Sequence, residues 1–223
     1  MTIRGTPPIH ETLVNRLKAD LPPVPRLWPP TARLASWLVL AAGVLAVAAA
    51  VGLRQDLGAQ LNRPLYLFQI AALLAAAALA AAAALRAAVP GHGGERRRAG
   101  LAVALGLVGT VLLLGEPETG SLSPVVFIAT GVRCAACVAM FGLLPWVALF
   151  LAIGRTAPLD GRAAGRYAGG AAFLIGATAV RLACPIDEPA HLLTSHVVPV
   201  LLWSSLSALA GAAWLVRWRT GSS

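Results

Sequence analysis

The side chains best suited to chemistry lie in two short stretches of the sequence. The first is Cys134-Ala-Ala-Cys137, a C-x-x-C pair. The second holds five ionisable or metal-binding side chains within 13 residues: Cys184, Asp187, Glu188, His191 and His196. Thiolate and imidazole groups bind zinc, cadmium or copper, and a thiophilic metal would compete with a disulfide for the same sulfurs.

The second stretch has two interpretations. In the first, four of its side chains could transiently hold a thiophilic metal ion: Cys184, Asp187, His191 and His196. Their spacing matches no closed structural zinc pattern, and two histidines five residues apart do not stack cleanly on one face of an α-helix. In the second, the stretch is a polar loop whose histidines lie among the lipid headgroups. Arg181, one turn before Cys184, should pair with Asp187 or Glu188, and it could also hold a thiolate in its charged form.

The elements that position these groups are predicted to be membrane-spanning helices. The chain has 223 residues, of which 58% are hydrophobic and 12% charged, and its mean hydropathy is +0.76. Globular chains carry about 25% charged residues, so the composition excludes an ordinary soluble enzyme, a disordered tail and a disulfide-framework mini-protein. Six apolar stretches could cross a bilayer as helices, the third being short and rich in glycine: 34–53, 64–85, 99–115, 134–154, 167–183 and 195–216.

The predicted fold is an all-α integral membrane protein built as a bundle of six transmembrane helices. Residues 1–33 form an N-terminal segment, residues 34–216 the transmembrane domain and residues 217–223 a tail. Gly165, Gly169 and the stretch 172–176 give the fifth span a small-residue face that permits close helix packing. The span interiors offer few polar groups, and the sequence shows no Ser-His-Asp arrangement, phosphate loop or intramembrane carboxylate pair. We therefore expect no enzymatic activity.

The distribution of positive charge predicts the orientation of the bundle. With the N-terminus in the cytoplasm, 14 of the 18 Arg and Lys residues fall on that side, and the other side keeps Arg54, Arg63, Arg133 and Arg181. This asymmetry satisfies the positive-inside rule, so both termini should be cytoplasmic, and the net charge of +9 requires no nucleic-acid partner. No cleavable signal peptide precedes the first span, so residues 1–33 are expected to stay in the cytoplasm.

This topology places all three cysteines near the outer face. Cys134 starts the fourth span and Cys184 closes the fifth, so the two could form a disulfide in the oxidising compartment outside a bacterial inner membrane. Cys137 could be a small apolar filler of a helix interface. The C-x-x-C pair could also be redox-active, but the chain lacks the βαβ pattern of thioredoxin-like proteins.

The N-terminal segment contains a short apolar stripe. The residues of the stripe recur about every four positions: Ile9, Leu13, Leu17 and Leu21, with Val14 beside them. This spacing predicts an amphipathic helix over 9–21, followed by an extended, proline-rich stretch over 22–30. The helix could lie on lipid, with Trp28 and Trp37 as interfacial anchors, or it could bind a partner protein.

Several short motifs, in their order and spacing, resemble the NrsF family of bacterial membrane anti-sigma factors. The motifs are residues 13–30 leading into 33–38, Gly131-Val-Arg-Cys134, Arg155-Thr-Ala-Pro158 followed by Ala164-Gly165, and Cys184-Pro-Ile-Asp187 with His191 and His196 downstream. Each motif is short, so the specificity of the resemblance resides in their order along nearly the whole chain.

The resemblance implies a negative regulator that holds an extracytoplasmic-function (ECF) sigma factor at the inner membrane through its N-terminal segment. It also implies that Cys134 and Cys184 respond to heavy-metal or oxidative stress, after which the sigma factor is released. Cys137 falls on no motif position and leaves the cysteine pairing open. The resemblance favours partner binding by the apolar stripe and requires no cofactor. The alternative function is a small metal- or thiol-handling membrane protein that uses the stretch from Cys184 to His196.

Overall fold

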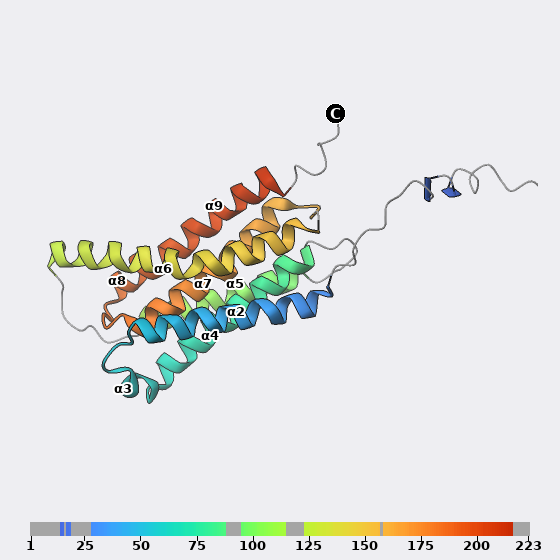
Figure 1. The fold of residues 1–223 in the computed structure, drawn as a ribbon. Helices are drawn as coiled ribbons and strands as arrows, with labels where there is room; N and C mark the ends of the chain where they lie inside the picture. Colours follow the sequence, from blue (N-terminus) through green and yellow to red (C-terminus); the bar gives the residue numbers. More distant parts are fainter. Residues whose placement is uncertain are drawn as a thin grey trace, which may run out of the picture.

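The chain is mostly helical within the residues that the computed structural model describes, which are 14–15, 17–18, 28–87, 95–114, 123–156 and 158–215 (Figure 1). Six elements form the bundle: α2 (Pro30–Val51), α4 (Pro64–Ala87), α5 (Glu95–Leu114), α6 (Pro124–Gly154), α7 (Gly161–Ala183) and α9 (Val198–Trp214). Three short elements complete it: α3 (Leu57–Leu61), α8 (Pro189–Leu192) and the π-helical turn η1 (Leu193–Val197). The last two run without a break into α9. Within these ranges no strand occurs, as the predicted all-α class requires.

Several helices begin at a proline, and these prolines mark the points at which the chain enters the bundle. Pro30, Pro64, Pro124 and Pro189 each occupy the first residue of a helix. Proline is tolerated there because the first N–H of a helix has no intrahelical partner and because the fixed φ of proline matches the helix. The prolines therefore set the entry point of each helix at little energetic cost.

Four helices in the described part of the chain are long and apolar enough to cross a membrane: Pro30–Val51, Pro64–Ala87, Pro124–Gly154 and Pro189–Trp214. The other two predicted spans coincide with α5 and α7, whose compositions are less apolar. Glycines and the arginines at 96–98 lower the hydropathy of α5, and glycines with Arg162, Arg166 and Arg181 lower that of α7. The predicted fourth span, 134–154, lies within α6, which begins ten residues earlier, at Pro124.

Successive long helices run in opposite directions, so the bundle has two distinct ends. At one end the first residues of α2 meet the end of α6, where the guanidinium of Arg33 donates a hydrogen bond to the carbonyl of Ala152. At the other end the backbone N–H of Arg54 donates to the carbonyl of Leu182, and the hydroxyl of Tyr66 donates to the carbonyl of Arg181. The segments just after α2, at the start of α4 and at the end of α7 therefore meet at this second end, which also carries α3 and α8 (Figure 1).

Helix α7 lies between α2, α4, α6 and α9, and small residues allow the close approach (Figure 1). A Cβ atom added at Gly165 would lie 2.3 Å from the carbonyl oxygen of Ser207 in α9. One added at Gly176 would lie 2.2 Å from the carbonyl oxygen of Val138 in α6. The predicted small-residue face of this helix is confirmed, because these distances leave no room for any side chain.

Large apolar side chains cover the outside of the bundle, while alanines fill much of its inside. Fully buried alanines include Ala77, Ala81, Ala84, Ala164, Ala168 and Ala171. The exposed side chains include Val39, Phe68, Val125 and Leu201. This distribution is typical of helices packed in lipid, where van der Waals contact between small residues, and not exclusion of water, holds helices together.

Trp37 lies inside the bundle and not at a lipid interface. Its side chain is 4% exposed, and its indole N–H donates a 2.9 Å hydrogen bond to the carbonyl of Pro145 in the middle of α6. Trp28, by contrast, is 68% exposed. The interpretation of both tryptophans as interfacial anchors is therefore wrong for Trp37, because a helix neighbour satisfies its donor.

We expect that Gly165→Ala destabilises the bundle by about 1–3 kcal/mol, because the new methyl group forces α7 away from the backbone of α9. Gly170→Ala is the matched control on the same helix, since its Cβ would have Ser204 Oγ as its nearest neighbour, at 3.7 Å. Replacing a helical glycine by alanine at such an open position should be neutral or slightly stabilising. Thermal unfolding of the two variants in detergent measures the difference. Equal midpoints would contradict the close α7–α9 contact.

Candidate functional site

A buried cluster of ionic groups lies at the end of the bundle that carries α3 and α8. Its centre is Asp187, 3% exposed, which lies between the guanidinium groups of Arg54 and Arg181. Arg54 donates two hydrogen bonds to the Asp187 carboxylate, of 2.8 and 2.7 Å, and Arg181 donates a third of 2.5 Å. Arg54 also binds the exposed carboxylate of Asp56, at 2.6 and 2.9 Å. Two arginines and two aspartates thus compensate each other's charge.

Polar and aromatic neighbours complete the coordination of the two guanidinium groups. The amide oxygen of Gln69, in α4, accepts a 3.0 Å hydrogen bond from Nε of Arg181. The guanidinium of Arg181 also lies 4.8 Å from the ring centre of Tyr66, within the range of a cation–π interaction. Gln60, in α3, donates to the carboxylates of Asp56 and Asp187 at 3.1 and 3.3 Å. The ion cluster therefore ties α3, α4 and the segment after α2 to the end of α7.

The cluster keeps its carboxylates ionised. Burial on its own would raise the pKa of Asp187, but the hydrogen bonds from Arg54 and Arg181 outweigh this and hold that pKa below its usual value. Hydrogen bonds from Arg54 and Gln60 lower the pKa of Asp56, and the bond to Asp187 raises the pKa of Arg54. A carboxylate with a lowered folded-state pKa contributes its full stabilisation above the unfolded-state pKa of about 4, and loses it as the pH falls through the folded-state value.

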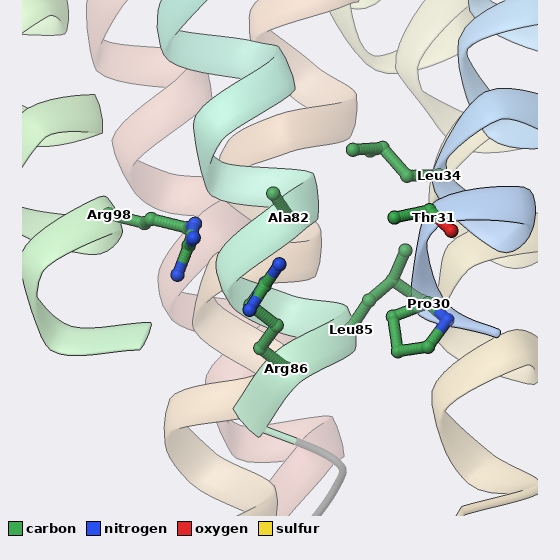
Figure 2. Close-up of a pocket in the computed structure, with 7 residues that line it drawn as sticks. All are labelled: Pro30, Thr31, Leu34, Ala82, Leu85, Arg86 and Arg98. Atoms are coloured by element: carbon green, nitrogen blue, oxygen red, sulfur yellow. The ribbon is translucent and has the colours of Figure 1, made fainter. Parts of the chain in front are cut away.

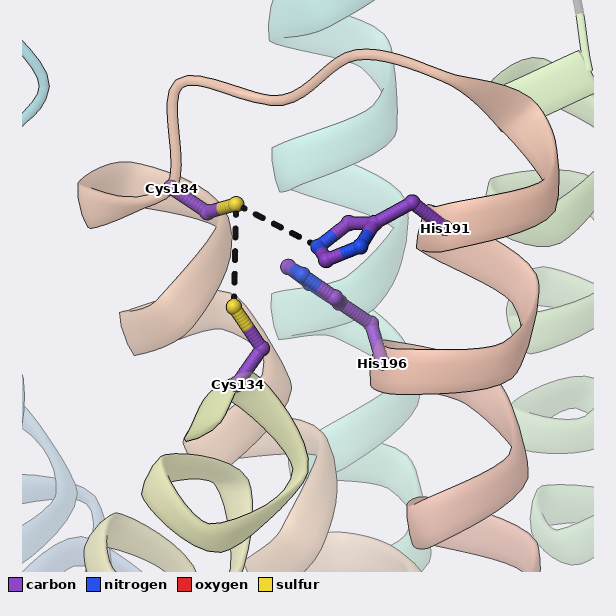
Figure 3. Close-up of side chains that lie close together, drawn as sticks. All are labelled: Cys134, Cys184, His191 and His196. Atoms are coloured by element: carbon purple, nitrogen blue, oxygen red, sulfur yellow. Dashed lines mark hydrogen bonds between the residues drawn. The ribbon is translucent and has the colours of Figure 1, made fainter. Parts of the chain in front are cut away.

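A second cluster, the thiol–imidazole cluster, consists of Cys134, Cys184, His191 and His196 (Figure 3). The four potential ligand atoms all lie within 4.8 Å of one another, and three of the four residues are buried. Cys134 comes from α6, Cys184 from the residue just after α7, and the histidines from α8 and η1. The two sulfurs are 3.8 Å apart, and Nε2 of His191 lies 3.6 Å from Sγ of Cys184.

The thiols of this cluster are free and not bonded to each other. The Cys134 thiol donates toward Sγ of Cys184, and this contact lowers the pKa of the Cys184 thiol against the opposing effect of burial. His196 lowers it further. Cys184 is therefore the sulfur that more readily carries negative charge, and a thiolate is the form of cysteine that binds metals and attacks disulfides.

The π-helical turn explains why two histidines five residues apart face the same space. In an α-helix, residues five apart point about 140° away from each other. In η1 the backbone N–H of residue i+5 donates to the carbonyl of residue i, as Val198 does to Leu193, and this wider turn brings residues five apart closer to one face. The rings of His191 and His196 consequently lie 5.8 Å apart, centre to centre. The expectation that they would not share a face is wrong, because the helix widens between them.

The structure changes the set of possible metal ligands predicted from the sequence. Cys184, His191 and His196 do come together, but Asp187 does not join them, because its carboxylate is bound by two arginines. Cys134 takes the fourth place. The expected ion pair of Arg181 is confirmed, with Asp187 as its partner. Cys137 packs against Val138 and its apolar neighbours instead of joining the cluster.

Arg54 is a member of the site that the sequence did not predict, because its residue type and position marked it only as one of four positive charges on the outer side. The available signal was Arg54-Gln-Asp56, an ion pair two residues apart directly after an apolar span. Tyr66 and Gln60 gave no signal of their own, since their roles arise only from contacts across the fold.

Two buried ring nitrogens of the thiol–imidazole cluster have no hydrogen-bond partner: Nδ1 of His191 and Nε2 of His196. The other unpartnered buried side-chain atoms within the described ranges are Nε2 of Gln69 and Oε2 of Glu188. A buried polar atom without a partner costs about 1–3 kcal/mol. The unsatisfied atoms of the described residues thus gather in and beside the two clusters.

The opposite end of the bundle carries a small pocket of about 120 Å³ (Figure 2). Its walls come from the start of α2, the end of α4 and the start of α5: Pro30, Thr31, Leu34, Ala82, Leu85, Arg86 and Arg98. The pocket adjoins the point where the N-terminal segment enters α2. Of the predicted apolar stripe, Val14 and Leu17 are helical and 43% and 58% exposed, whereas Ile9, Leu13 and Leu21 lie outside the described residues.

We expect that Asp187→Asn lowers the free energy of unfolding by about 3–5 kcal/mol, because it leaves Arg54 and Arg181 buried with one carboxylate fewer. Asp56→Asn is the matched control. It removes the same charge from the same Arg54, but the Asp56 side chain is 48% exposed, so its loss should cost less than about 1 kcal/mol. Denaturant unfolding in detergent at neutral pH measures both values. Similar losses for both variants would contradict a buried, structure-determining Asp187.

The family of the chain follows from comparison with known proteins. The model of the NrsF family, described as negative regulator of sigma F, matches residues 17–218. Comparisons with curated proteins and with solved structures gave no match. The matched region includes all six long helices and both clusters described above. The chain belongs to the NrsF family of negative regulators of a sigma factor.

Proposed function

We propose that this protein is a membrane-bound anti-sigma factor that sequesters an ECF sigma factor at the bacterial inner membrane and releases it when Cys134 and Cys184 sense heavy-metal or oxidative stress. The observation that carries the proposal is the position of two functional elements at opposite ends of one bundle. The paired thiols lie at one end, and the N-terminal segment joins α2 at the other.

The charges of the bundle support a topology of six spans with both termini in the cytoplasm. The end at which α2 begins carries Arg33, Arg86, Arg97, Arg98, Arg155, Arg162 and Arg166. The thiol-bearing end carries only Arg54, Arg63, Arg133 and Arg181 among the described arginines, and Asp56 and Asp187 compensate the charges of Arg54 and Arg181. Most of the positive charge of the bundle thus lies at the end where α2 begins, which the positive-inside rule assigns to the cytoplasm. The cysteines are then outside and the N-terminal segment inside.

The fold offers a physical route between the two ends. Cys134 belongs to α6 and Cys184 follows α7, so forming or breaking an interaction between the sulfurs changes the separation of these helices. At the opposite end, the hydrogen bond from Arg33 to Ala152 couples α6 to the first turn of α2. A shift of α6 would therefore displace the first turn of α2, where the sigma-binding segment joins the bundle. A signal crosses a protein in this way only if the element has two arrangements whose balance the outer site changes.

The binding stripe for the sigma factor is Ile9, Leu13, Val14, Leu17 and Leu21. The side chains of Val14 and Leu17 are exposed, so neither is buried against the bundle. An apolar helix face of this kind binds in a groove of a partner through residues at i, i+3, i+4 and i+7.

The first test concerns retention of the sigma factor. Burying one leucine contributes roughly 1.5–3 kcal/mol, so Leu13→Asp with Leu17→Asp should abolish binding in a pull-down with the cognate sigma factor and cause constitutive expression of its regulon. Thr12→Asp with Asn15→Asp is a control that adds the same charge off the stripe and should retain binding. Normal retention by the Leu13/Leu17 double variant would place the interface elsewhere.

The second test concerns the response to stress. Cys134→Ser and Cys184→Ser should each blunt induction of a reporter of the sigma regulon by cadmium or a thiol oxidant, and the double variant should be no worse than either single one, because the two sulfurs act as a unit. Cys137→Ser should have a smaller effect, since this side chain lies outside the thiol–imidazole cluster. Normal induction in both single variants, or loss of induction with Cys137→Ser alone, would contradict the proposed pair.

A further inference from the structure

We infer that the thiol–imidazole cluster is a four-coordinate site for a divalent metal ion of the zinc type, with His191 and His196 as ligands beside Cys134 and Cys184. Cys134 belongs to α6 and Cys184 directly follows α7, whereas His191 belongs to α8 and His196 to η1. Their four ligand atoms all lie within 4.8 Å of one another. This inference deepens the proposed function, because it names what the two sensing sulfurs bind.

Two of the distances in the cluster agree with tetrahedral coordination. With Zn–S bonds of about 2.3 Å and Zn–N bonds of about 2.0–2.1 Å, a regular tetrahedron separates two sulfurs by about 3.8 Å and a sulfur from a nitrogen by about 3.6 Å. The sulfurs of Cys134 and Cys184 are 3.8 Å apart, and Sγ of Cys184 lies 3.6 Å from Nε2 of His191. A disulfide requires about 2.05 Å between sulfurs. The side chains are therefore spaced for a shared ion and would have to move closer to form a disulfide.

The charge of the occupied site suits its burial. Binding of M²⁺ releases one proton from each of the two thiols, and the two thiolates then balance the two positive charges of the ion. The neutral imidazoles add no charge. A site with no net charge avoids the large cost of placing an uncompensated ion among buried groups such as Cys184, His191 and His196. The nearby ion cluster is balanced on its own, so it does not oppose the cation.

The local fold supports a ligand role for the histidines in particular. The π-helical turn is a departure from α-helical geometry that brings His196 beside His191, and such turns occur frequently at functional sites. The ring of His196 is 3% exposed, and its Nε2 has no hydrogen-bond partner. Figure 3 shows both rings turned toward the two sulfurs. A metal ion in the cluster would give Nε2 of His196 the interaction that the protein alone does not supply.

The test uses the full-length chain, purified in detergent under reducing conditions without a sigma factor, and titrated with Co²⁺ and then Zn²⁺. We expect one Co²⁺ per chain, with a thiolate-to-cobalt charge-transfer band and the visible ligand-field bands of four-coordinate cobalt, and displacement by Zn²⁺. His191→Gln and His196→Gln should weaken binding by at least roughly 10- to 100-fold, the loss that removal of even an outer partner of a ligand causes. Cys137→Ser is the matched control and should bind like the wild type.

A second measurement uses the wild-type chain and so does not depend on how the variants fold. Zn²⁺ should protect Cys134 and Cys184 from alkylation, as read by mass spectrometry, and leave Cys137 reactive. Absence of Co²⁺ binding, equal alkylation of all three cysteines, or unchanged affinity in both histidine variants would overturn the metal site. Because no sigma factor is present, failure here leaves retention by the N-terminal segment to its own test.

Discussion

The structure depends most on the burial of Asp187 between two guanidinium groups. Arg54 follows α2 and Arg181 lies in the last turn of α7, so both would bring a positive charge into the packed end of the bundle. Buried charges must be paired, and Asp187 pairs with both at once. Asp187 follows Cys184 by only three positions, so the same contacts hold the segment after α7 in place. The thiol–imidazole cluster owes its position to this ion cluster.

The central position of α7 follows from a different constraint, the absence of a hydrophobic driving force between helices in lipid. A helix of glycine and alanine has little apolar surface to offer lipid, but it permits four neighbours to approach its backbone. Gly165 and Gly176 show this on opposite partners, α9 and α6. One of the two least apolar long helices is consequently the one that the others surround, and its last turn carries Arg181 to the ion cluster.

The two clusters at the thiol-bearing end differ in their hydrogen bonding and in the helices that they join. The ion cluster is fully hydrogen-bonded around Asp187 and joins α3, α4, α7 and the segment after α2. The thiol–imidazole cluster joins α6 to the start of the last helix and contains free sulfurs and unpartnered ring nitrogens. A network whose buried carboxylate is fully paired, beside free sulfurs and unpartnered ring nitrogens, suits a site whose state changes while its surroundings keep their geometry.

The sequence by itself determined the helical class, the approximate position of each long helix, the asymmetry of charge and the pairing of Arg181, because each depends on composition, periodicity or neighbouring residues. Tertiary structure alone decided which groups meet. Asp187 binds two arginines instead of joining the histidines, since Arg54 reaches it from 133 positions away. Trp37 is buried because α6 offers it the carbonyl of Pro145. His191 and His196 face each other because a π-helical turn begins between them and includes His196, and a pattern read at 3.6 residues per turn contains no sign of that change.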